Sequence, residues 1–328
     1  GVVPGGGLKK IIDSPDGGVT YDYAPKKVTK KVRDKQKASE RQEKQGGFHP
    51  EGDEQNEKGN AKATPFSGPA EVKAVIIHVT AGLDYGAEPV QEINRQHKNR
   101  DFSGIGYHYL ISRGTGGSKP DGSIYEARPT RYRGAHTRGA NAYSISISMI
   151  ADCDTMGTYT SSGEYPTLMQ KDSMEDLTLY LMFKYGLLQL RKDSAITGQY
   201  NLWIEGSAGP KKIGVIFKTG TGAIKLQVPS QDWGLILYGH NEFANKRCPC
   251  FRMKNALAGQ LGKNLNEKLF LRTMEIFLLL GAPVSDQHMD GDTVKPSSFL
   301  SNMKPGTIPS PYEGTDNFDG VGQYVNSN

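Results

Sequence analysis

Three side chains that suit a zinc ion lie at the ends of strand-like runs or shortly after them. His78 is near the end of the apolar run 72–79, His240 follows the apolar run 235–238, and Cys248 comes eight residues later. Two imidazoles and one thiolate give a tetrahedral zinc three protein ligands and leave one position for water. A single thiolate leaves the site with a net positive charge, which favours acidification of that water and polarisation of a carbonyl. The three residues therefore predict hydrolytic zinc chemistry.

These residues alone leave a structural alternative open. A single histidine on a strand is often a packed structural residue, and the spacing from His240 to Cys248 matches no standard structural zinc motif. The HExxH motif is absent, and Cys248-Pro249-Cys250 differs from the Pro-Cys-x-x-Cys motif of zinc deaminases. Residue types and spacing thus indicate a metal site without identifying its class.

The segments that must position these side chains alternate between strand-like and helix-like patterns. The chain has 328 residues, enough for one large domain or two ordinary ones, and its 36% hydrophobic content indicates a globular centre diluted by irregular segments. Residues 144–150 alternate serine with isoleucine or methionine, which predicts a half-buried strand. Apolar runs and helical spacings predict further strands at 72–79, 106–111 and 123–126, helices at 88–99, 173–191, 251–261 and 266–280, and a β-hairpin within 203–228. The predicted fold is α/β or α+β, with a central mixed β-sheet flanked by helices.

Both ends of the chain predict extended arms around a central domain over residues 67–282. Residues 26–44 hold nine basic and three acidic side chains, a local charge of 9 − 3 = +6, against +5 for the whole chain. The basic charge therefore belongs to the arm 1–66, and residues 283–328 predict an extended C-terminal tail. The longest apolar run, 276–281, is too short to cross a bilayer, so we expect no membrane span and no signal peptide.

The three cysteines are too few for a disulfide scaffold. A bridge between Cys248 and Cys250, one residue apart, would strain disulfide geometry. We expect Cys153 to be a buried thiol, and we expect synthesis in the cytosol with free thiols or a metal site.

Five sequence blocks together resemble a known enzyme family. In order and rough spacing, they are similar to zinc-dependent N-acetylmuramoyl-L-alanine amidases, the type shared by phage lysozyme-like amidases and peptidoglycan recognition proteins. The resemblance covers about residues 70–262 and implies the amidase fold, whereas the hairpin at about 200–230 is an insertion that departs from the family. The blocks are Ile76-Ile77-His78, Gly106-Tyr107-His108-Tyr109, Gly134-Ala135-His136, Asn141 to Ile147, and His240 to Phe251.

The resemblance implies a role for each matching residue. It assigns His78, His240 and Cys248 as zinc ligands, with Tyr107 and Lys246 as catalytic residues. Zinc would activate a water and hold the scissile carbonyl of the amide between N-acetylmuramic acid and L-alanine. Tyr107 would orient the water or the substrate, and Lys246 would stabilise the developing oxyanion. Ser146 departs from the family, because a glycine is common at its position.

The other histidines receive separate expectations. His136 lies in a loop-like stretch and is expected to contact substrate. We expect His108 to be structural, because it is adjacent to Tyr107 on a strand and points to the opposite face. His97 is expected to lie on the surface.

The arms and the phage-type resemblance together predict a virion-associated enzyme, made in the host cytoplasm and carried in a phage tail or baseplate to degrade the cell wall. Its partners would be bacterial peptidoglycan and, through the arms, virion structural proteins. Nucleic acid is disfavoured because no aromatic residue interrupts the basic window 26–44. The alternatives are a catalytically silent peptidoglycan-binding protein and a structural virion protein built on the amidase fold.

Overall fold

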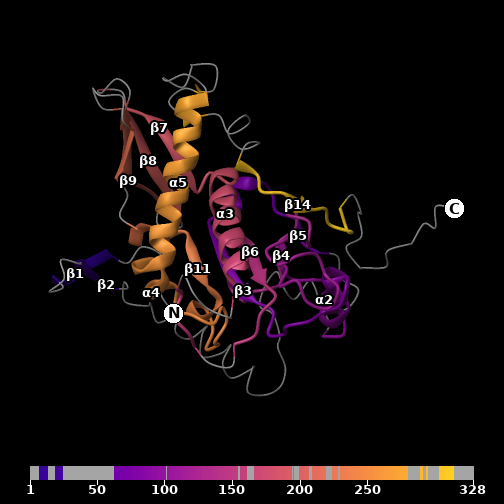
Figure 1. The fold of residues 1–328 in the computed structure, drawn as a ribbon. Helices are drawn as coiled ribbons and strands as arrows, with labels where there is room; N and C mark the ends of the chain where they lie inside the picture. Colours follow the sequence, from indigo (N-terminus) through magenta and orange to yellow (C-terminus); the bar gives the residue numbers. More distant parts are fainter. Residues whose placement is uncertain are drawn as a thin grey trace.

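A mixed six-stranded β-sheet forms the centre of the computed structural model (Figure 1). The structure describes residues 7–13, 19–24, 63–279, 289–290, 293–294 and 303–313; within 63–279 it leaves out 101, 154–155, 161–165, 194, 196–198, 207–208, 219–223 and 228–229. The strand order is β11 (Leu237–Gly239), β3 (Ala74–Val79), β6 (Ser144–Met149), β4 (Tyr109–Ile111), β5 (Ile124–Glu126) and β14 (Thr307–Ile308). All neighbours are parallel except β4 and β5. The predicted fold class is confirmed.

Helices cover both faces of this sheet. On one face, Ile77 of β3 and Ile147 of β6 belong to the same apolar core as α3 (Leu168–Lys184), and α3 packs in turn against α5 (Gln260–Leu279). The short helix α4 (Met253–Ala258) joins this layer. On the other face, Val90 and Ile93 of α2 (Pro89–Lys98) pack with Leu110 and Tyr125. The helices expected at 88–99, 251–261 and 266–280 are therefore present.

Strand β6 is buried on both faces, not half-buried as its sequence predicts. Its isoleucines join the apolar core, whereas Ser144 and Ser146 hydrogen bond to buried histidines on the opposite face. The alternation of serine and isoleucine therefore separates an apolar layer from a polar cluster inside the protein. An alternating pattern of polar and apolar residues does not show whether the polar face contacts solvent or a buried polar cluster.

A second six-stranded sheet replaces the simple hairpin predicted for 203–228. Its strand order is β10 (Ile224–Gln227), β9 (Gly209–Lys218), β8 (Gln199–Gly206), β7 (Leu188–Lys192), β13 (Thr293–Val294) and β12 (Met289–Asp290). The helix predicted over 173–191 is wrong beyond Lys184, because α3 ends there and β7 begins at Leu188. Gly186, with φ +67°, turns the chain between them.

The N-terminal segment contains a β-hairpin where the sequence predicts no regular structure. Strands β1 (Gly7–Asp13) and β2 (Val19–Ala24) pair antiparallel. The basic window 26–44 lies outside the described residues. From Ala63 onward the chain packs in the central domain. Ala63 is buried, and the Phe66 backbone N–H donates a hydrogen bond to the Arg131 carbonyl.

The C-terminal region also differs from the extended tail predicted for 283–328. Strand β14 pairs in parallel with β5 (Figure 1), and the backbone carbonyl of Ala127 accepts a hydrogen bond from Ser310. Met303 and Tyr312 are buried. Residues 303–313 are therefore held by the chain's own domain.

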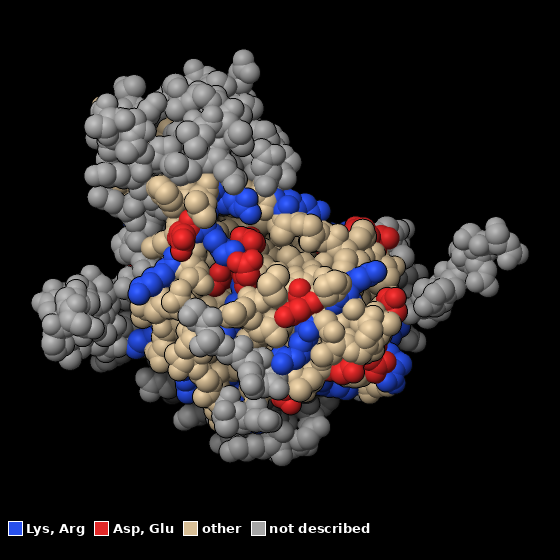
Figure 2. Space-filling model, in the orientation of Figure 1, with Lys and Arg blue, Asp and Glu red and all other residues tan. Residues whose placement is uncertain are grey.

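The described surface in Figure 2 mixes Lys and Arg with Asp and Glu, without one sign dominating this face. Among the described residues, no helix combines the length and apolar character that a membrane crossing requires.

Candidate metal centre

The structure brings His78, His240 and Cys248 together at one end of the central sheet. Their candidate ligand atoms all lie within 4.8 Å of one another. His78 is on β3, and His240 begins the short 3-10 helix His240–Glu242 directly after β11. Because β3 and β11 are parallel neighbours, both histidines arrive at the same end of the sheet. Cys248 follows on the loop after that short helix.

The donor set fits a tetrahedral zinc ion. His78 Nδ1 lies 3.8 Å from Cys248 Sγ, and the His78 and His240 rings have centroids 4.6 Å apart. Zinc–nitrogen bonds of about 2.0–2.1 Å and zinc–sulfur bonds of about 2.3 Å separate tetrahedral ligand atoms by about 3.4–3.6 Å. This geometry requires a contraction of a few tenths of an ångström between His78 and Cys248, and of at most about 1.2–1.4 Å for the widest pair.

Burial sets the protonation of the three residues. Burial lowers the pKa of His240 to about 3 and that of His78 well below its ordinary value, and the positive charge of Lys246 lowers both further. Neutral imidazoles are the form that binds a metal. Burial raises the pKa of the Cys248 thiol to about 12, although the Val79 backbone and Lys246 act in the opposite direction. A cation bound here must therefore displace the thiol proton.

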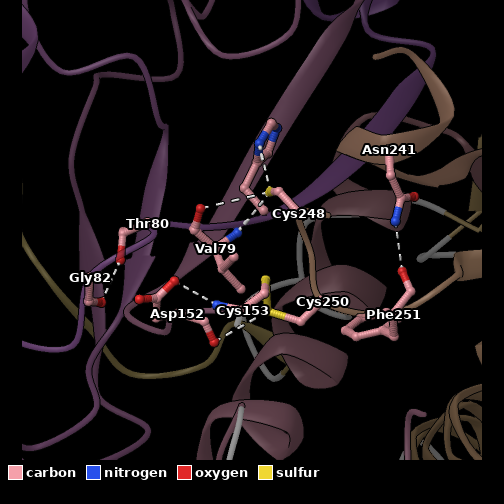
Figure 3. The surroundings of a disulfide bond; sticks show 10 residues. Val79, Thr80, Gly82, Asp152, Cys153, Asn241, Cys248, Cys250 and Phe251 are labelled. Atoms are coloured by element: carbon pink, nitrogen blue, oxygen red, sulfur yellow. Dashed lines mark hydrogen bonds between the residues drawn. A yellow bond between two sulfur atoms is a disulfide. The ribbon is translucent and has the colours of Figure 1, made fainter. Parts of the chain in front are cut away.

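A disulfide fixes the chain beside Cys248. Cys250 is bonded to Cys153, so the prediction of a Cys153 thiol is wrong (Figure 3). The two residues are 97 positions apart, and no local spacing indicates their pairing. Cys248 is the free cysteine, and its sulfur accepts a hydrogen bond from the Val79 backbone at 3.2 Å (Figure 3). The expectation of free thiols therefore holds for Cys248 alone.

Tyr107 and Lys246 both lie near the three ligands. The Tyr107 ring is half-buried, with its centroid 5.4 Å from that of His78. Burial raises the pKa of Tyr107, and the neighbouring Cys248 raises it further, so the phenol stays protonated and can donate a hydrogen bond. Lys246 is half-buried, and its charge acts on His78, His240 and Cys248.

His136 lies behind His78, on the side away from Cys248. It is buried, and its Nδ1 is 3.0 Å from His78 Nε2. The Thr137 hydroxyl lies 3.0 Å from His136 Nδ1 and 3.2 Å from His78 Nε2. The structure thus places His136 against the candidate ligand His78.

His108 is held inside the protein, as expected for a structural residue. Its Nδ1 accepts a hydrogen bond from the Ser146 backbone at 3.1 Å, and its Nε2 lies 2.9 Å from the Tyr132 carbonyl. The Ser146 hydroxyl accepts from the His108 backbone at 3.0 Å. Ser146, the departure from the family pattern, therefore helps to fix the segment that carries Tyr107.

The prediction of a surface position for His97 is wrong. His97 is buried, accepts a hydrogen bond from the Gly106 backbone at 3.0 Å, and has its ring centroid 5.4 Å from that of Tyr107. Its contact with the residue before Tyr107 makes it part of the site's support. Val90, Ile93 and His97 occupy helical positions i, i+3 and i+7, a pattern that already indicates an inward-facing residue.

Comparisons with known proteins cover the first part of this domain. The sequence model of the N-acetylmuramoyl-L-alanine amidase family matches residues 68–212. This range includes His78, Tyr107 and His136, whereas His240, Lys246 and Cys248 lie beyond it and reach the site through the fold.

Individual relatives include phage and animal proteins. The endolysin of Enterobacteria phage T3 is 28% identical over 120 residues, which are 37% of this chain and 73% of that protein. Peptidoglycan-recognition protein 2 of Holotrichia diomphalia is 39% identical over 90 residues, 26% of this chain and 44% of that protein. The solved N-acetylmuramoyl-L-alanine amidase LysC from Clostridium intestinale URNW aligns at 23% identity and a TM-score of 0.36, over 64% of this chain and 92% of that one. The sequence comparisons support an N-acetylmuramoyl-L-alanine amidase family for this domain.

Proposed function

We propose that the protein is a zinc-dependent amidase that hydrolyses the bond between N-acetylmuramic acid and L-alanine in bacterial peptidoglycan. The observation that carries this proposal is the convergence of His78, His240 and Cys248 within 4.8 Å. The amidase family model matches residues 68–212, which include His78, and the donor set leaves one tetrahedral position for water or substrate.

Each residue around the three ligands has a task that follows from its chemistry. Zinc, when bound, supplies an activated water and polarises the amide carbonyl. The protonated Tyr107 phenol donates a hydrogen bond that orients the water or the carbonyl. Lys246 places a positive charge beside the ligands, where negative charge develops on the carbonyl oxygen. Removal of one such stabilising group typically lowers turnover by about 10²–10³-fold.

Digestion of purified peptidoglycan by the zinc-loaded protein tests the proposal. Mass spectrometry should detect stem peptides with a free N-terminal alanine, and a folded Cys248→Ser variant should release none. Intact peptidoglycan from the folded, zinc-loaded protein would overturn the amidase proposal and favour a binding role, which the likeness to a peptidoglycan-recognition protein makes the second candidate. New reducing sugar ends would show that a different bond is cleaved.

We further infer that the protein acts on the wall as a phage component. The phage endolysins among its relatives support this inference, and the segments 1–66 and 283–328 are the proposed contacts to virion structural proteins. Proteomics of purified phage particles tests it: the chain should co-purify with tail or baseplate proteins. Its detection only in lysed cells would place it among free endolysins.

A further inference from the structure

His78 and His136 form a buried pair whose rings meet edge to face. Their centroids lie 5.0 Å apart at an interplanar angle of 85°, and His78 Nε2 is 3.0 Å from His136 Nδ1. For these two nitrogens to hydrogen bond, one of them carries the hydrogen; the Thr137 hydroxyl beside them can donate or accept and is compatible with either direction. The identity of that nitrogen determines which His78 nitrogen has a free lone pair for a metal.

Ser144 determines the direction of this hydrogen bond. The Ser144 hydroxyl donates its only proton to the Ala140 carbonyl at 2.7 Å. Towards His136 Nε2, at 3.5 Å, the Ser144 oxygen can therefore only accept. His136 then carries its hydrogen on Nε2, and its Nδ1 is an acceptor.

We propose that His136 is a positioning residue, which holds His78 in the tautomer that presents a bare Nδ1 to the metal. With His136 Nδ1 as acceptor, His78 Nε2 is the donor, and the hydrogen bonds run in one direction from His78 through His136 and Ser144 to Ala140. His78 Nδ1 is then free of hydrogen on the side facing Cys248 Sγ, 3.8 Å away. This inference rests on the metal site of the proposed function and not on the amide bond that is cleaved.

The opposite tautomers of His136 and His78 would be unfavourable for both contacts of the pair, the one with Ser144 and the one with a metal. A hydrogen on His136 Nδ1 would leave Nε2 and the Ser144 oxygen facing each other as two acceptors. His78 would then carry its hydrogen on Nδ1, where it blocks the lone pair that a cation needs. The hydrogen bond from Ser144 to Ala140 therefore favours the state in which His136 carries its hydrogen on Nε2 and His78 carries its hydrogen on Nε2.

The loop that carries His136 is fixed by backbone contacts. Asn141 Oδ1 accepts hydrogen bonds from the backbone of both His136 and Thr137, at 3.0 Å and 2.9 Å. A Cβ on Gly134 would overlap the His136 ring, and a Cβ on Gly106 would overlap the Ala135 carbonyl. Glycines at both positions allow the loop to press His136 against His78.

This placement gives His136 a role other than the substrate contact expected from sequence. The residue is 6% exposed, and both of its ring nitrogens face partners inside the protein. Outer partners of metal-bound histidines fix the ring and the tautomer, and their loss typically weakens metal affinity or activity by about 10–100-fold.

Two measurements on the full chain test the proposal without peptidoglycan. The first is ¹⁵N NMR of the histidine rings in metal-free protein, which should show His78 protonated on Nε2 and bare on Nδ1. The second is zinc affinity, measured by competition with a chromophoric chelator. His136→Phe should weaken zinc binding by about 10–100-fold and release His78 into a mixture of tautomers. His136→Asn places an amide oxygen near the lost Nδ1, and should restore most of the affinity.

Glu175→Gln is the control, because Glu175 is also buried, at 1% exposed, and its carboxylate accepts hydrogen bonds from Tyr159 and Asn264 between α3 and α5, not at the three candidate ligands. It should bind zinc as the unaltered protein does. A folded His136→Phe variant with unchanged zinc affinity would overturn the proposal. If that variant does not fold, a His78 hydrogen on Nδ1 in the unaltered protein would overturn it equally. If the unaltered protein binds zinc but leaves peptidoglycan intact, the amidase proposal is wrong, whereas the role proposed for His136 is unaffected.

Discussion

Cys250 anchors the chain two residues after Cys248 by its disulfide to Cys153, a residue just beyond the end of β6. The backbone of Gly157 adds a hydrogen bond to the Cys250 carbonyl at 2.7 Å. The loop that presents the Cys248 sulfur is therefore tied at a fixed place to the strand beside β3, which carries His78.

Removal of this disulfide should weaken both the fold and the metal site. A Cys153→Ala/Cys250→Ala double variant lacks a cross-link between residues 97 positions apart. We expect its free energy of unfolding to fall by about 2–4 kcal/mol, because the unfolded chain gains freedom. Its zinc affinity should fall by about tenfold, because the Cys248 loop loses an anchor. Denaturant titration and chelator competition measure the two effects, and an unchanged zinc affinity would show that the loop needs no anchor.

Lys246→Ala should separate catalysis from metal binding. Loss of the positive charge should lower turnover of peptidoglycan by about 10²–10³-fold. Zinc affinity should change little, because the Lys246 charge repels a bound cation but also lowers the pKa of the Cys248 thiol, so that its loss has two opposing effects. The matched control is Lys263→Ala on the exposed face of α5, which should keep normal turnover. Near-normal turnover of Lys246→Ala would remove Lys246 from the mechanism.

Glu175 should make stability depend on pH. It lies between α3 and α5, where burial raises its pKa from 4.5 to about 7, while hydrogen bonds from Asn264 and Tyr159 oppose the shift. A carboxyl whose pKa is raised by folding favours the folded state fully below pH 4.5. This contribution is lost as the pH rises through about 7, and it amounts to about 3 kcal/mol.

Glu175→Gln keeps the size of the side chain and removes its titration. The difference in free energy of unfolding between this variant and the unaltered protein should therefore change between pH 4.5 and 7, in favour of the variant at the higher pH. Urea denaturation at several pH values measures it. A difference that is constant with pH would mean that Glu175 does not titrate in this range. Burial also raises the pKa of Glu242 to about 7, and this residue contributes equally to both proteins.

Tyr312 should stabilise the central domain although it lies in the C-terminal region. Its ring is 7% exposed and packs in the apolar cluster that includes Ile105 and Leu110. Tyr312→Ala should lower the free energy of unfolding by about 3 kcal/mol, by analogy with other aromatic-to-alanine changes in cores. Tyr312→Phe keeps the ring and should lose much less. Equal stability of the alanine variant and the unaltered protein would contradict the packing of residues 303–313.

The sequence predicts the elements whose burial follows a single period. Strand β3 is a continuous apolar run, and α2 and α5 follow helical spacing, so these elements appear where they were expected. Leu188 fits the helical spacing of the preceding residues, yet it begins β7, because Gly186 and the pairing with β8 decide its conformation. The two-residue strand β14 carries no pattern of its own and depends on contact with β5.

The candidate site is likewise predicted only where local sequence patterns indicate its residues, and not where contacts between distant segments decide the arrangement. The sequence blocks that resemble the amidase family indicate His78, His240 and Cys248. The structure brings their candidate ligand atoms within 4.8 Å of one another. The bond between Cys153 and Cys250 joins distant segments and has no local signal. The hydrogen bonds of His136 and Ser144 depend on how the loop before β6 folds back on the start of that strand, which spacing along the chain does not define.

Strand β14 also constrains the order in which the domain is completed. An exposed strand edge is a template for pairing with other chains, and here residues 307–308 cover the edge of β5. These residues follow β5 by more than 180 positions, so the edge stays open while the ribosome makes everything between them. During synthesis the nascent sheet is therefore exposed to strand addition by neighbouring polypeptides, and it becomes protected only when its last strand emerges.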